Sequence, residues 1–214
     1  TFPVSTNYVE RVGENKRWNS SEINFLSAPG GRFDWIIGGF YYHETLDQPY
    51  DITVPDVALF ERPVSVSAAV PQIVNPRRSY FSQRGQLSST ALAAFGQITW
   101  RITPMLALEI GARYSEDQKR GREDQFQVFY NVQVDPGNAY GVLNAGRNLR
   151  SDWGAFSGNI GLNFQPGDDT LVYARVSRGY KSGGFSLGAL APVPEVDFEH
   201  VTAYEIGWKQ GFGW

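Results

Sequence analysis

The chain has 214 residues, a formal net charge of −3, no cysteine and 14% aromatic residues. The small negative charge and the scattered Lys and Arg argue against a nucleic-acid partner, and the absence of cysteine excludes disulfide frameworks, zinc clusters and thiol nucleophiles. No segment approaches the roughly 18 to 20 apolar residues that a membrane helix needs, whereas a membrane-spanning strand needs only about 9–11 residues with every second one apolar.

Alternation of apolar and polar residues predicts about seven β-strands. Because successive side chains of a strand point to opposite faces, each such segment has two faces of different character. The first strand alternates around Ile23 and Phe25, and the second, Phe33 to Glu44, is apolar on both faces near its centre, so its facing stays open. The other strands are predicted within residues 88–101, 105–119, 152–164, 170–181 and 200–210.

The connections between these strands alternate between short and long. Tight turns rich in Gly, Pro and Asp fall at residues 29–31, 102–104 and 166–169, and long segments at 46–87, 120–151 and 182–199. A compact soluble domain rarely carries several structureless connections longer than about 15 residues. Outer-membrane barrels do so regularly, with short periplasmic turns and long extracellular loops. The pattern therefore predicts an all-β fold, namely an antiparallel transmembrane β-barrel.

The composition of the two strand faces agrees with this prediction. One face carries Leu, Ile, Val, Phe, Ala and Gly, with aromatic residues near strand ends at Trp100, Tyr114, Phe164, Tyr180 and Trp208. This distribution is typical of the aromatic girdles at the two bilayer interfaces, so the apolar face is predicted to contact outer-membrane lipid. A sandwich or a soluble barrel is the alternative. About seven strands cannot close a bacterial barrel of at least 8, so we expect an internal piece of a larger one.

Several sequence segments in the predicted strands resemble those of TonB-dependent outer-membrane receptors of the siderophore type. They are "SSEINFLSAPGGRFDWIIGGFYYHE" (20–44), "AAFGQITWRIT" (93–103), "LEIGARYSEDQK" (108–119), "LVYARVSRGYKSGGF" (171–185) and "VDFEHVTAYEIGWKQ" (196–210). The resemblance implies that residues 1–214 are part of a barrel domain of about 22 strands in a Gram-negative outer membrane. It also implies a plug domain and C-terminal strands beyond this sequence.

The same resemblance implies a function and partners. Such receptors take up a scarce substrate such as a ferric siderophore, haem, cobalamin or a glycan, and the TonB complex of the inner membrane drives the transport. A passive diffusion porin and a soluble β-rich binding module remain the alternatives. The sequence has no nucleophile elbow, phosphate loop or H-E-x-x-H pattern, so we expect no enzyme activity and no cofactor.

Charged and aromatic residues of the predicted lumen and loops are the candidate site. The ligand-binding candidates are Tyr130, Tyr140, Arg147, Arg150, Arg175 and Lys181, and the candidates for contacts with the plug or along the barrel wall are Glu109, Arg113, Glu205 and Lys209. The alternative interpretation is that the aromatic residues and arginines of the loops only pack the loops against their neighbours. The lumen charges would then form cross-strand pairs, each stabilising the sheet by at most about 1 kcal/mol. His43 and His200 are far apart in sequence, so no metal site is predicted.

Overall fold

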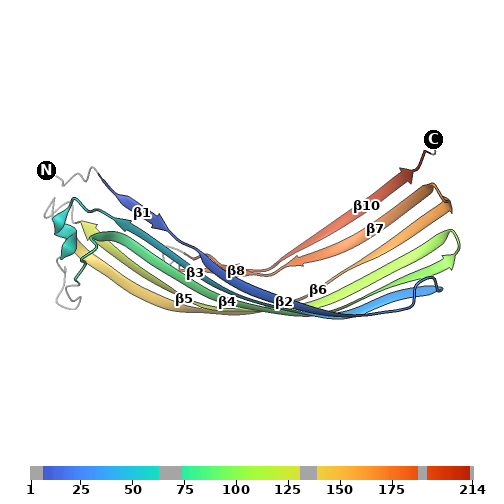
Figure 1. Cartoon of the computed structure of the whole chain (residues 1–214), viewed down its shortest axis with the longest axis horizontal. Coiled ribbons are helices and arrows are strands. Elements are labelled where there is room, and N and C mark those ends of the chain that lie inside the picture. Colours follow the sequence, from blue (N-terminus) through green and yellow to red (C-terminus); the bar gives the residue numbers. More distant parts are fainter. Residues whose placement is uncertain (1–6, 63–73, 131–138, 188–191, 213–214) are drawn as a thin grey trace.

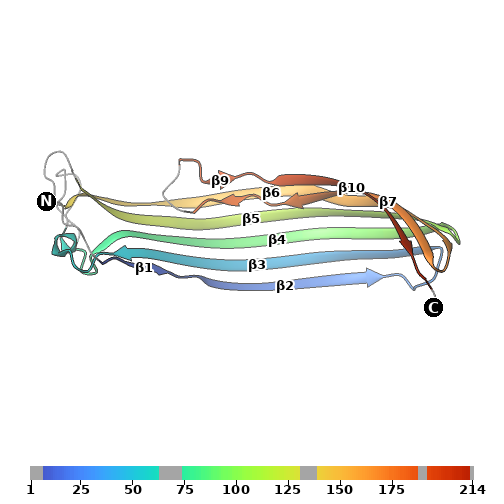
Figure 2. The ribbon, with the colours of Figure 1, turned by 90° about the horizontal axis from the view of Figure 1, so that it is seen from above.

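One curved antiparallel sheet makes up almost the whole molecule (Figures 1 and 2). The computed structural model describes residues 7–62, 74–130, 139–187 and 192–212. Its elements are β1 (Val9–Val12), β2 (Asn15–Leu26), β3 (Phe33–Thr53), the 3-10 helix η1 (Ala58–Glu61), β4 (Ser79–Thr103), β5 (Leu106–Tyr130), β6 (Ala139–Gly167), β7 (Thr170–Lys181), β8 (Gly184–Phe185), β9 (Glu195–Val196) and β10 (Glu199–Gln210). Within these ranges no helix is long and apolar enough to cross a membrane.

The sheet has seven strand positions in sequence order. Strands β1 and β2 both pair with β3 along different stretches of it, and β3, β4, β5, β6, β7 and β10 follow as successive hydrogen-bonded neighbours. Every pairing is antiparallel. This arrangement confirms the all-β prediction and the predicted strand count, and the curved sheet is an open section of a barrel wall (Figure 1).

Short turns gather at one end of the sheet and long connections at the other (Figure 2). The short turns join β2 to β3, β4 to β5 and β6 to β7. In the first of them Gly30 has a φ of 86°, a left-handed conformation that glycine adopts without a steric penalty. The long-connection end carries a small core in which Val54, Val57 and Phe60 pack with Val128 of β5.

The strands continue further than the sequence pattern indicated. Strands β4 and β5 each have 25 residues and β6 has 29, so they occupy much of 46–87 and 120–151, which we predicted as connections. The reason is physical: where both faces of a strand meet water, hydrophobic alternation disappears although the backbone ladder continues. Only 182–199 keeps the predicted form, a connection in which β8 and β9 make a two-residue pairing.

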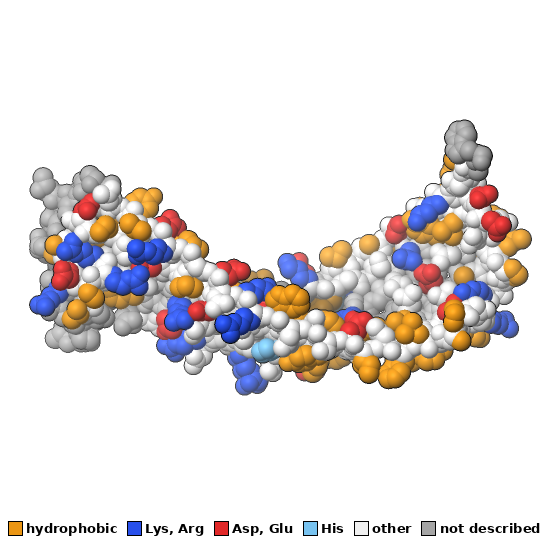
Figure 3. Space-filling view, viewed as in Figure 1, with side chains coloured by type: hydrophobic (Ala, Val, Ile, Leu, Met, Phe, Trp, Pro, Cys, Tyr) orange, Lys and Arg blue, Asp and Glu red, His pale blue; other side chains and the backbone are white. Residues whose placement is uncertain are grey.

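Cross-strand register shows which side chains share a face. Ile110 lies opposite Ile98 on one side and Ile160 on the other, and Ile160 lies opposite Val176. The side chains of this parity are exposed on the convex face, where apolar groups gather toward the short-turn end (Figure 3). Strongly exposed residues of this face include Ile23, Phe25, Ile37, Phe156, Ile160, Tyr204, Ile206 and Trp208. Strand β3 joins this face through Phe33, Trp35 and Ile37, which settles its facing.

The height of this surface, which we call the apolar band, matches a lipid bilayer. It extends from the level of Phe164, opposite Leu106, to the level of Tyr41 and Leu92, opposite Glu116. Ten residue steps along β5 correspond to about 33 Å of strand, or about 23 Å of height at a tilt near 45°. Outer-membrane barrels have an apolar band about 25 Å tall. Aromatic rings pack near both margins, with centroid separations of 6.0 Å for Phe33–Trp100 and 4.8 Å for Tyr114–Phe156.

Tyr180 does not belong to the aromatic girdle, where the sequence pattern placed it. We expected it on the lipid face with Val176, but β7 stops pairing with β6 after Arg178 and turns toward the concave side. There Tyr180 lines a cavity together with Arg113 and Asp117.

A cationic side chain in the middle of the apolar band is expected to destabilise the barrel. Ile160→Arg should lower the free energy of unfolding by about 2–4 kcal/mol, because the cation would be held in hydrocarbon. Asn159→Arg, on the same strand but facing the lumen opposite the uncharged Gly111 and Ser177, is the matched control and should cost less than about 1 kcal/mol. Urea titration of the receptor in vesicles measures both, and equal losses would contradict the assigned facing.

Candidate functional site on the concave face

The concave face near the short-turn end carries ion pairs and hydrogen bonds that join neighbouring strands. Arg175 Nη2 lies 2.7 Å from Glu109 Oε2, and Asn163 donates a 2.9 Å hydrogen bond to Glu109 Oε1. Tyr173 donates a 2.5 Å hydrogen bond to Glu205, and Lys209 Nζ lies 5.7 Å from the centroid of the Tyr173 ring. The charges at Glu109, Arg175, Glu205 and Lys209 are thus engaged by adjacent strands of the same wall. A plug contact of these residues remains a prediction.

Arg113 occupies the middle of the concave face. Its guanidinium carbon lies 5.1 Å from the Phe40 ring centroid and 5.6 Å from that of Phe95, within the range of cation–π attraction. Its Nε donates a 2.9 Å hydrogen bond to Ser115 Oγ. Two cavities of about 270 and 570 Å³ open on either side of it, and Arg113 lines both. A cation held in place by two rings beside open space is arranged to meet a ligand or a second domain.

Lys119 and Trp153 lie further toward the long-connection end of the concave face. Lys119 Nζ donates a 2.7 Å hydrogen bond to the Gly183 carbonyl and lies 5.7 Å from the Trp153 ring centroid. The Trp153 ring also packs against Phe185, with centroids 6.0 Å apart. The segment after β7 is therefore folded onto the concave face. Partial burial lowers the pKa of the Lys119 amine.

A second group missed by the sequence analysis surrounds Glu44. Lys16 Nζ lies 2.7 Å from Glu44 Oε2, and the Tyr42 hydroxyl also donates to that carboxylate. The hydrogen bond with Glu44 raises the pKa of Lys16. For Lys119 a usable signal was present: it has the same parity as Arg113, so continuing the alternation to the end of 105–119 would have placed it on the lumen side.

The predicted ligand-binding residues do not converge. Arg147 faces the concave side and forms a 2.7 Å ion pair with Glu123, whose side chain is fully buried. Arg150 lies opposite Arg120 on the convex face and is exposed. Lys181 ends β7 and is exposed. Tyr130 and Tyr140 belong to β5 and β6 rather than to a loop, and their side chains lie outside the described residues.

The two histidines of the chain have separate surroundings. His43 Nδ1 lies 3.0 Å from Thr90 Oγ1 on the neighbouring strand, whereas His200 packs against Tyr180 and Phe198. In the described ranges no group of three or more His, Cys, Asp or Glu is placed to hold a metal ion.

Comparison with known proteins decides the family. The family model described as "TonB dependent receptor-like, beta-barrel" matches residues 2–214. The chain belongs to the TonB-dependent receptor family. This membership confirms the sequence resemblance. The family consists of outer-membrane receptors, not enzymes, so the apolar band faces the lipid of the outer membrane.

Similar proteins include two pesticin receptors and a ferric yersiniabactin uptake receptor. The pesticin receptor of Yersinia pestis is 27% identical over 136 residues, which cover 63% of this chain and 18% of that protein. The pesticin receptor of Yersinia enterocolitica is 26% identical over the same share. The crystal structure of the ferric yersiniabactin uptake receptor FyuA from Yersinia pestis matches with a TM-score of 0.65 at 18% identity, covering 95% of this chain and 28% of that one. The chain thus corresponds to less than a third of each relative's length.

Removing the Lys119 ammonium should loosen the segment after β7. Lys119→Met keeps the apolar stem but loses the hydrogen bond to Gly183 and the cation–π contact, which together are worth about 1 kcal/mol at this half-exposed site. Amide hydrogen exchange of residues 184–187 should become about fivefold faster, as measured by mass spectrometry. Lys209→Met is the control, since Lys209 contacts Tyr173 and not this segment. Unchanged exchange in Lys119→Met would show that other contacts hold the segment.

Proposed function

We propose that this chain forms part of the barrel wall of a receptor that actively imports a ferric siderophore across the outer membrane. The parent protein would include a plug domain inside the lumen and would be energised by the TonB complex. Membership of the TonB-dependent receptor family supports the mode of transport. The names of the relatives, a ferric yersiniabactin uptake receptor and two pesticin receptors, support the substrate class.

The arrangement around Arg113 is the observation that carries the proposal. A ferric siderophore is a bulky, often anionic complex with aromatic or carboxylate groups, so its binding site needs cations and aromatic rings around an open volume. Arg113 provides a cation fixed between Phe40 and Phe95 at the boundary of two cavities. Lys119 and Lys181 add positive charge on the extracellular side of Arg113. The Glu109–Arg175 pair lies closer to the periplasmic end, at the level proposed to meet the plug.

Loss of the Arg113 charge should impair substrate binding or the seating of the plug. Arg113→Gln is expected to weaken binding of the ferric siderophore to the receptor by about tenfold, because a charge-assisted contact contributes about 1.5–3 kcal/mol. Uptake of radioactive iron complex by cells carrying the variant, with binding to the purified receptor, measures the effect. Arg32→Gln is the control, because Arg32 lies in the exposed turn between β2 and β3, at the periplasmic end.

A second measurement distinguishes the proposal from passive diffusion. Liposomes containing the parent receptor should not swell in solutions of small sugars, because the plug closes the lumen. Rapid swelling, or iron uptake that continues in cells lacking the TonB complex, would contradict energised import. Equal binding by Arg113→Gln and the unmodified receptor would remove Arg113 from the pathway without affecting the family assignment.

A further inference from the structure

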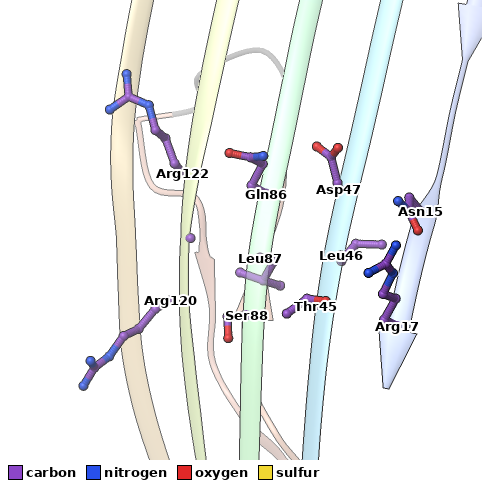
Figure 4. Close-up of a pocket in the computed structure, with 11 residues that line it drawn as sticks. Asn15, Arg17, Thr45, Leu46, Asp47, Gln86, Leu87, Ser88, Arg120 and Arg122 are labelled. Carbon is purple, nitrogen blue, oxygen red and sulfur yellow. The ribbon is translucent and has the colours of Figure 1, made fainter. Parts of the chain in front are cut away.

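The ladder between β6 and β7 stops inside the apolar band. Pairing of the two strands ends where Gly158 lies opposite Arg178. Toward the extracellular end β6 continues with β5 as its partner, whereas β7 and β10 end near the middle of the sheet (Figure 1). By contrast, β3, β4, β5 and β6 still run side by side at the level of Thr45, Ser88 and Arg120 (Figure 4). We call the edge of β6 at residues 154–157 the seam.

The seam lies at membrane depth. Gly158 is level with Ala112, and the upper level of the band is at Glu116, opposite Gly154. Four steps of a strand tilted near 45° correspond to about 9 Å of height, so the seam occupies the upper part of the band.

Backbone groups of the seam need a partner other than lipid. The neighbour of β6 in the sheet is β7, whose other edge is taken by β10, and in the described part of the chain no strand pairs with the seam. Part of its N–H and C=O groups therefore point away from β5 without a ladder partner. Unpaired backbone at this depth is tolerated only where it is covered by protein or lines a water-filled cavity.

A cavity of the lumen reaches the seam. It has a volume of about 570 Å³, and Gly158 and Arg178, the last pair of the β6–β7 ladder, line it together with Arg113. Arg178 has the same parity as Val176, which faces lipid, yet it contributes to this lumen cavity. The inner and outer sides of the wall therefore meet at the seam, and water in the cavity can satisfy its backbone groups.

The cavity is suited to an anionic group. Two arginines line it, and none of the described residues of its lining is an Asp or a Glu. Arg113 is held beside the rings of Phe40 and Phe95, whereas the Arg178 side chain is exposed. Uncharged hydrogen-bonding side chains complete the lining: Gln97, Ser115, Ser157, Asn159 and Tyr180.

An apolar depression lies on the convex face directly below the seam. Its volume is about 490 Å³, and its nearest lining residue on β6, Ile160, is two residues from Gly158. Ala174 lies opposite both Leu162 and Ile206, and its small side chain leaves the depression open. The apolar lining residues are Leu108, Ile160, Leu162, Ala174, Val176, Tyr204 and Ile206. A single alkyl chain fits such a surface.

We propose that the seam accepts a ferric complex that carries one acyl chain, with its anionic head in the lumen cavity and its chain in the outer depression. This inference rests on the proposed function and names a class of substrate for it. A substrate in the lumen reaches the cavity without crossing hydrocarbon. The phosphate of an outer-leaflet lipid would instead have to sink about 9 Å into the apolar band to reach it.

The test compares two iron complexes that differ in the chain alone. They are the ferric complex of a citrate dihydroxamate, which is anionic, and the same complex with one dodecanoyl chain. Binding of radioactive iron to the purified parent receptor in phosphatidylcholine nanodiscs is measured, and binding to empty nanodiscs is subtracted. The receptor should bind the acylated complex at least about tenfold more tightly than the other, which corresponds to about 1.4 kcal/mol.

Two variants separate the head site from the chain site. Arg178→Gln should weaken binding of the acylated complex about tenfold, because it removes one charge-assisted contact. Ala174→Trp fills the depression and should weaken binding of the acylated complex about fivefold while leaving the other complex unaffected. Ala94→Trp is its matched control, because Ala94 is exposed on the same face of β4, outside the depression, and should bind both complexes as the unmodified receptor does.

Four results would overturn the proposal. They are equal binding of the two complexes, binding of neither above empty nanodiscs, equal losses in Ala174→Trp and Ala94→Trp, and displacement of the acylated complex by phosphatidylglycerol. The proposed function fails separately, because iron uptake that continues without the TonB complex would contradict it whatever the acyl chain does.

Discussion

Backbone hydrogen bonding in hydrocarbon is the constraint on which this structure depends. Lipid offers no partner to a peptide N–H or C=O group, so each strand of the apolar band must be paired by a neighbour along its whole length. The antiparallel ladder from β2 to β10 meets this requirement for the strands inside it except at the seam of β6, whereas β2 and β10 each pair on one side only among the described residues. The ladder also fixes the direction of every side chain, because cross-strand partners share a face. An apolar residue such as Ile160 and a polar one such as Asn159 therefore have opposite environments although they are adjacent in sequence.

The same ladder supports two different surfaces above the membrane. On the concave side, Lys119 is held by Trp153 and the Gly183 carbonyl. One residue further along the strand, Arg120 points outward and has no carboxylate partner within the described ranges. Parity alone places one cation on the concave surface and the next on the convex surface. A barrel wall one residue thick can thus carry chemically different inner and outer surfaces at the same height.

Side-chain packing has an unusual distribution in such a wall. A soluble domain of this length would bury a large core, whereas here buried apolar groups cluster at the extracellular end around Val57, Phe60 and Val128. Elsewhere the convex side chains are exposed to lipid and the concave ones are tied by cross-strand contacts such as Glu109–Arg175. Stability in the membrane band rests on the ladder and on the match between apolar side chains and lipid.

The sequence by itself determined the strand count, the short turns and the facing of Leu108, Ile160 and Val176, because alternation is strong wherever one face meets lipid and the other meets polar groups. It did not determine the upper halves of β3 to β6, where water on both faces removes the alternation, and so Arg147 and Arg150 could not be assigned to opposite faces. Tertiary structure alone decided that β7 leaves β6 after Arg178 and carries Tyr180 into the lumen. It also decided that Arg17 shares a face with Arg120 and Arg150, because cross-strand register depends on long-range pairing that no local pattern encodes.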